Sequence, residues 1–161
     1  MAKWNTLPTQ EVINRTIEAL KANGIDAKFV ESAEEAKKEV LSLIPEGAEV
    51  MNMTSVTLDT IGLPQQLNES GKYNSVRNKL SSMNRATQGT EMQKLGAAPE
   101  WTVGSVHAVT EDGHILIASN TGSQLSAYVG GSSHVIWVVG TQKIVKDTEE
   151  GIKRIYEYVL P

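Results

Sequence analysis

A polar segment at residues 52–57, called here the first polar loop, carries residue types suited to holding a small anion. It lies where a predicted buried strand gives way to a predicted helix. Hydroxyl groups donate hydrogen bonds to anion oxygens, and the first turn of a helix adds backbone N–H donors. A plain helix cap by Thr54 or Ser55 explains the same pattern equally well. The candidate ligand-binding residues are Asn52, Thr54, Ser55 and Thr57.

A second polar loop, residues 118–124, follows a predicted strand and precedes a short predicted helix. Its glycine permits a tight turn, and polar side chains surround the start of the helix. In open α/β sheets, ligands bind outside the carboxyl ends of the strands, where both loops would lie. The alternative is a turn that only faces solvent. The candidate ligand-binding residues are Asn120, Thr121, Gly122, Ser123 and Gln124.

General acid–base chemistry has only three weak catalytic candidates, Glu111, His107 and Asp59, and they form no assignable pair. A metal site is not expected. His107 and His114 would lie on the order of 13 Å apart along a predicted hairpin, too far for one ion.

The first half of the chain alternates between helical and strand-like patterns. Apolar residues at helical spacing predict a helix over 11–22, and Ser32 followed by Glu35 predicts the capped start of a second helix. Short strands are predicted over 25–30 and 48–53, and a helix broken around Pro64 over 57–67. This alternation predicts a mostly parallel sheet with helices on both faces, a three-layer α/β sandwich.

The second half predicts strands over 101–110 and 114–119, joined as a β-hairpin at Asp112-Gly113. A further strand is expected over 134–139, and Asp147 is expected to cap a last amphipathic helix. The polar stretch Asn74–Gly96 predicts one or two helices, over a sheet edge or as a mobile cover. We expect one domain over residues 1–161.

Composition excludes several classes of protein. Fifteen Lys and Arg against 19 Asp and Glu give a net charge of −4, which argues against a nucleic-acid surface. The chain has no cysteine, so it has no thiolate for a disulfide, a zinc site or an iron–sulfur cluster, and no cofactor is expected in it. Neither a P-loop nor a GxGxxG fingerprint occurs. With no predicted membrane span, the expected location is cytoplasmic.

Several segments, taken in their order and spacing, resemble the LUD-domain family, the lactate-utilisation family that includes the lactate-utilisation protein C subunits. The segments that carry the resemblance are Thr54–Leu58, Ile61–Leu63, Ser105–His114, Ile117–Gln124, His134–Gly140 and Lys143–Val145.

The resemblance implies a fold like that of the phosphosugar-isomerase and CoA-transferase superfamily, in which the strand-to-helix loop at Thr54, Ser55 and Thr57 would bind a phosphate or carboxylate. It also implies a role in oxidising lactate to pyruvate beside separate iron–sulfur protein subunits. No glutamate stands where CoA-transferases place their nucleophile. Family members continue past the last helix, so an end at Pro161 predicts a chain without the C-terminal strand elements.

The leading hypothesis is therefore an accessory protein that binds a small anionic metabolite in lactate or 2-hydroxy-acid utilisation. One alternative is an isomerase- or hydrolase-like enzyme acting on a sugar phosphate or acyl-CoA. Another is a structural or regulatory subunit whose loops bind nothing. Self-association into a homo-oligomer is a further expectation.

Overall fold

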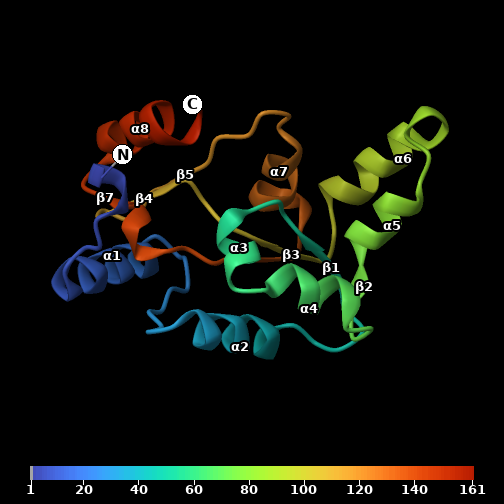
Figure 1. Ribbon diagram of the computed structural model, residues 1–161, viewed down its shortest axis with the longest axis horizontal. Coiled ribbons are helices and arrows are strands. Elements are labelled where there is room, and N and C mark those ends of the chain that lie inside the picture. Colours follow the sequence, from blue (N-terminus) through green and yellow to red (C-terminus); the bar gives the residue numbers. More distant parts are fainter. Residues whose placement is uncertain (1) are drawn as a thin grey trace. The chain divides into compact units, whose positions relative to one another are not determined.

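The computed structural model describes residues 2–161 and contains two compact units, each made of segments distant in the sequence (Figure 1). Unit 1 comprises the residues up to Glu31 together with Val106–Ala118 and Val139–Pro161. Unit 2 comprises Ser32–Ser105 and Ser119–Val138. The expectation of one domain over residues 1–161 stays a prediction.

Unit 2 is built on a parallel sheet whose strand order is β2-β1-β3-β6. Asn52 of β1 lies beside Val103 of β3, which lies beside Ile136 of β6. All neighbouring strands are parallel, as the alternation of helices and strands predicts. The strands are β1 (Glu49–Asn52), β2 (Asn74–Ser75), β3 (Trp101–Gly104) and β6 (His134–Trp137).

One face of this sheet packs against helices that precede and follow β1. Ser32 caps the first of them by accepting a hydrogen bond of 3.1 Å from the Glu35 N–H, which confirms the predicted start. The predicted break in the next helix falls at Gly62, just before Pro64. These helices are α2 (Ala33–Leu43), α3 (Val56–Thr60) and α4 (Leu63–Glu69). The buried cluster on this face is Val40, Ile44, Val50, Leu58, Leu63, Leu67 and Val103.

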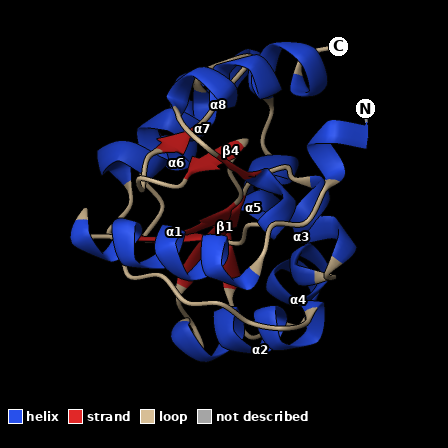
Figure 2. Cartoon of the chain, turned by 90° about the vertical axis from the view of Figure 1, so that its left-hand side faces the viewer, coloured by secondary structure: helices blue, strands red, loops and turns tan. Residues whose placement is uncertain are grey.

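Helices also cover the opposite face of the sheet. Side chains alternate along a strand, so Met51 and Gly104 face away from that cluster. A Cβ atom at Gly96 would lie 4.0 Å from the Met51 side chain, and one at Gly104 would overlap Tyr128. The helices are α5 (Val76–Ser82), α6 (Arg85–Ala97), α7 (Ser123–Ser126) and η2 (Ala127–Gly131). The predicted three layers are thus present in unit 2 (Figure 2).

Unit 1 contains a separate small sheet with the strand order β5-β4-β7. Its core is formed by Trp4, Ala108 and Val145, with Leu116 and Tyr158 packed against them. Its strands are β4 (Ala108–Thr110), β5 (Ile115–Leu116) and β7 (Ile144–Val145). Its helical elements are η1 (Ala2–Asn5), α1 (Gln10–Ala22), η3 (Thr141–Lys143), α8 (Thr148–Arg154) and η4 (Ile155–Val159).

Two predictions about strands were wrong, the single strand over 101–110 and the strand over 25–30. Residues 101–110 are not one strand but β3 and β4, which belong to different sheets, because strand propensity is local whereas pairing is not. The predicted hairpin is present and pairs Ala108 with Leu116. Its loop has three residues and closes through the Thr110 N–H on the His114 carbonyl. Residues 25–30 form no strand.

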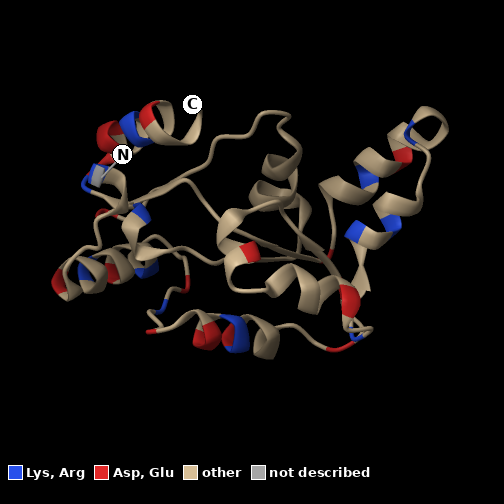
Figure 3. Cartoon of the chain, in the orientation of Figure 1, with Lys and Arg blue, Asp and Glu red and all other residues tan. Residues whose placement is uncertain are grey.

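The predicted cap of the last helix is confirmed. Asp147 caps α8 by accepting a hydrogen bond of 2.9 Å from the Glu150 N–H. Charges of both signs are interspersed along α1 and α2 (Figure 3). Within residues 2–161, no helix combines the length and the apolar character that a membrane span requires.

Candidate functional site

The first polar loop leaves the unit 2 sheet at the carboxyl end of β1. Asn52 is the last residue of that strand, and the Met53 N–H still donates to the Val103 carbonyl at 2.8 Å. The chain therefore turns away from the sheet only at Thr54, and α3 begins two residues later. This geometry places the loop at the strand-end edge where ligands bind in parallel sheets.

A cation lies directly against this loop. The Nε of Arg77 donates to the Asn52 carbonyl at 3.1 Å, and its Nη2 donates to the Thr54 Oγ1 at 2.8 Å. Arg77 is half-buried in the first turn of α5, which follows β2, the strand next to β1. A guanidinium stays charged at any physiological pH and can still donate N–H groups to an anion.

Sequence reasoning missed Arg77, because β2 has only two residues and gives no strand pattern. Without β2, nothing in the sequence places the start of α5 beside the end of β1. An arginine just after a helix N-cap serine was the one available signal, and alone it is weak.

The four predicted residues of the first polar loop play different parts. Thr54 is exposed and takes the bond from Arg77. The Ser55 Oγ accepts from the Leu58 N–H at 3.5 Å, so Ser55 is the helix cap that the simpler interpretation predicts. Thr57 is half-buried within α3. Asn52 is buried, and its Oδ1 has no hydrogen-bond partner among the described residues.

On the other face of the sheet, aromatic side chains lie at the ends of β3 and β6. The Tyr128 hydroxyl donates to the Ser105 carbonyl at 3.4 Å, and its ring meets Trp137 edge-on at 5.7 Å between centroids. Burial raises the pKa of Tyr128 to about 12, so this hydroxyl stays a neutral donor. Trp137 faces away from Asn52, so these groups do not extend the first polar loop.

In the second polar loop, two of the candidate residues bond to each other. Gly122 adopts φ +70°, as a tight turn requires, and the Thr121 Oγ1 donates to the Ser123 Oγ at 2.9 Å. Asn120 is exposed, Gln124 is half-buried, and α7 has only four residues. The first polar loop differs from this one in its contact with Arg77.

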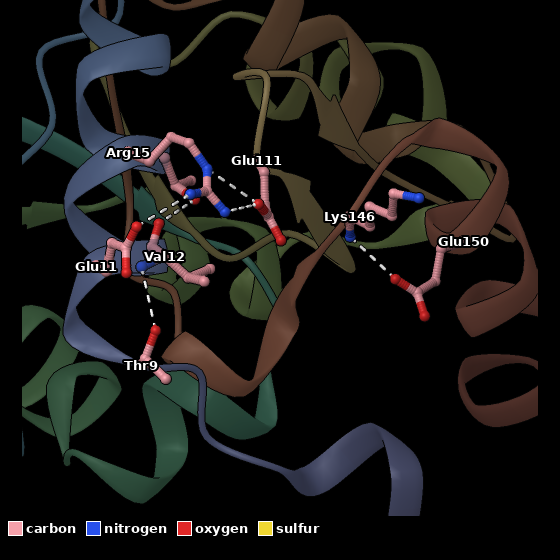
Figure 4. Close-up of polar contacts among 8 residues, drawn as sticks. Thr9, Glu11, Val12, Arg15, Glu111, Lys146 and Glu150 are labelled. Atoms are coloured by element: carbon pink, nitrogen blue, oxygen red, sulfur yellow. Dashed lines mark hydrogen bonds and ion pairs between the residues drawn. The ribbon is translucent and has the colours of Figure 1, made fainter.

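The three catalytic candidates are divided between the two units. Glu111 of unit 1 is held by Arg15, whose Nε donates to its Oε2 at 3.1 Å (Figure 4). Asp59 is exposed on α3 in unit 2. His107 of unit 1 is half-buried, and its Nδ1 accepts from the Ala118 N–H at 3.1 Å, which leaves the ring proton on Nε2.

Unit 1 gathers three basic side chains at one place. The Lys143 Nζ donates to the Val106 carbonyl at 2.9 Å, and the Arg154 Nη1 donates to the neighbouring His107 carbonyl. Burial, and secondarily the charges of Lys143 and Arg154, lowers the pKa of His107 below its ordinary value. Burial, followed by the charge of Arg154, lowers the pKa of Lys143 to about 8. Sequence reasoning singled out only His107, because Lys143 and Arg154 lie far along the chain.

The lowered pKa of Lys143 makes a pH-dependent contribution to stability. Between pH 8 and its ordinary value of 10.5, the unfolded chain binds a proton that the folded protein does not, so stability rises with pH. Because solvent screens the partly exposed amine, we expect wild type to gain about 1 kcal/mol relative to Lys143→Met between pH 7 and 9.5. Urea unfolding of both proteins in phosphate-free buffer measures it. A difference that does not change with pH would contradict the prediction.

No group of three or more metal-ligating side chains occurs within residues 2–161. The His114 Nδ1 instead lies 3.1 Å from an Asp112 carboxylate oxygen in the hairpin loop.

Comparison with known families gives one match. The family model for the LUD domain matches residues 13–161. Neither a curated protein nor a solved structure matches the chain.

Proposed function

Since this chain belongs to the LUD-domain family, a family related to lactate utilisation, we propose that it binds a small anionic metabolite at the first polar loop. The observation that carries the proposal is the contact of Arg77 with Asn52 and Thr54 at the carboxyl end of β1. A fixed positive charge, a neighbouring hydroxyl and an exposed loop are what a carboxylate needs for recognition.

Lactate and pyruvate fit this chemistry, because each carries one carboxylate beside a hydroxyl or carbonyl oxygen. The guanidinium of Arg77 would pair with the carboxylate, while the Thr54 and Ser55 hydroxyls would donate to the second oxygen function. The proposed role is an accessory one in lactate or 2-hydroxy-acid utilisation. The chain has no cysteine, so iron–sulfur chemistry would come from separate partner subunits.

Thermal unfolding with a ligand panel tests this site. The panel is lactate, pyruvate, a sugar phosphate and a CoA thioester. A ligand at about 100 times its dissociation constant adds roughly 2.7 kcal/mol, or about 5–10 °C in the midpoint for a chain of this length. We expect lactate or pyruvate to give this shift, and Arg77→Met to weaken binding roughly tenfold or more.

Lys79→Met is the matched control, because Lys79 is an exposed cation on the same helix as Arg77. Thr54→Ala, an exposed substitution, is a second variant that is expected to keep the fold and weaken binding. No shift with any ligand, or equal shifts in Arg77→Met and Lys79→Met, would overturn the proposal. Turnover of a sugar phosphate or CoA thioester would show an enzyme instead.

A further inference from the structure

We propose that His107, Lys143 and Arg154 of unit 1 form a second anion site, which binds an oxyanion with two negative charges such as the phosphate of a phosphate monoester. The site does not depend on the first polar loop, which belongs to unit 2. It rests on two basic side chains, Lys143 and Arg154, that donate to the adjacent carbonyls of Val106 and His107.

Arg154 is the central observation. Its side chain is buried, with a relative exposure of 3%, and its Nε–H has no acceptor among the described residues. Its contacts are the His107 carbonyl and the Tyr158 ring, whose centroid lies 5.1 Å from the guanidinium carbon. A buried guanidinium without a carboxylate is costly, and its planar fork of N–H groups matches an oxyanion.

Lys143 places a second positive charge beside Arg154. Its ammonium bonds to Val106, one residue from the carbonyl that holds Arg154, and the two charges influence each other. The charge of Arg154 disfavours the charged form of Lys143 in the folded protein, and an anion bound to both would offset that repulsion. Lys143 is half-buried, so a small ion can reach it from solvent.

His107 supplies a neutral donor to the same cluster. Since its Nδ1 accepts from Ala118, its Nε2–H is the atom available to an anion. The cluster therefore combines two cations with one neutral donor, which suits a phosphate dianion better than a single carboxylate.

Two carboxylates of unit 1, Glu111 and Glu150, have other partners. Glu111 pairs with Arg15. Glu150 accepts from the Lys146 N–H at 2.9 Å (Figure 4). It also pairs with Lys3 at 3.3 Å. Neither carboxylate therefore neutralises the charge of Arg154.

The test uses inorganic phosphate as the probe, at constant ionic strength with chloride as the reference. The unfolding midpoint of wild type should rise saturably with phosphate, by about 5–10 °C at about 100 times the dissociation constant. Lys143→Met and Arg154→Lys should weaken binding roughly ten- to a hundredfold. Lys146→Met, which removes an exposed lysine three residues from Lys143, should bind like wild type. Lys143→Met should lose the midpoint shift with phosphate but keep the shift with lactate or pyruvate, which separates this site from the first polar loop.

Amine labelling of wild type provides a readout that no folding defect can affect. Phosphate should slow acylation of Lys143, measured by mass spectrometry, at least about fivefold at saturation while Lys146 labels unchanged. Three outcomes would overturn the proposal. Phosphate would not shift the midpoint of wild type, or it would shift the midpoints of Lys143→Met and Lys146→Met equally, or it would not slow the acylation of Lys143. Equal shifts would show that phosphate acts on the whole surface as a stabilising salt.

Discussion

Gly131→Ala is expected to lower the free energy of unfolding by about 3 kcal/mol or more. A Cβ atom at this position would lie 1.9 Å from the Ala97 carbonyl oxygen and 2.7 Å from the Ser126 carbonyl oxygen. Both are backbone atoms, at the end of α6 and in α7, so no side-chain rotation relieves the overlap. The helices would have to move apart, which exposes apolar surface on that face of the sheet. Denaturant unfolding followed by circular dichroism measures the loss.

Gly130→Ala is the matched control for this prediction. A Cβ atom at Gly130 meets nothing within 4 Å, and the residue is exposed. Alanine there is expected to change stability by less than about 1 kcal/mol, in the stabilising direction, because it restricts the unfolded chain. Equal effects of the two substitutions would show that α6 does not pack closely against η2.

Leu58→Ala is expected to cost about 3–5 kcal/mol. Leu58 has 0% relative exposure and belongs to the buried cluster with Val50, Leu63 and Val103. Its side chain fixes α3, a helix of only five residues that has little stability of its own. Because α3 begins within the first polar loop, the same substitution is expected to make that loop more mobile and to weaken the binding of any ligand there.

Val56→Ala is the control on the same helix, since Val56 is 83% exposed. It is expected to change stability by less than about 0.5 kcal/mol. Hydrogen exchange at residues 54–58 would report the local effect, with faster exchange in Leu58→Ala than in Val56→Ala. A stability loss below about 1 kcal/mol for Leu58→Ala would show that α3 does not pack as described.

Local signals in the sequence determined the helices and the class of fold. Ser32 and Asp147 cap the helices that they were predicted to cap, because a cap depends on residues only a few positions apart. The alternation of helix and strand over the first half of the chain predicted the parallel sheet of unit 2, although the strand over 25–30 does not form. It also placed the first polar loop at the carboxyl end of a strand.

Only the tertiary structure decided which strands pair and which residues the side chains of Arg77 and Arg154 contact. Residues 101–110 look like one strand, yet β3 and β4 find partners in two different sheets. Arg77 reaches Thr54 across 23 positions, and Arg154 reaches His107 across 47. Periodicity and capping have a range of a few residues, whereas pairing and charge contacts depend on where distant segments pack. The polar loops were therefore visible in the sequence, whereas the contacts of Arg77 with Thr54 and of Arg154 with His107 were not.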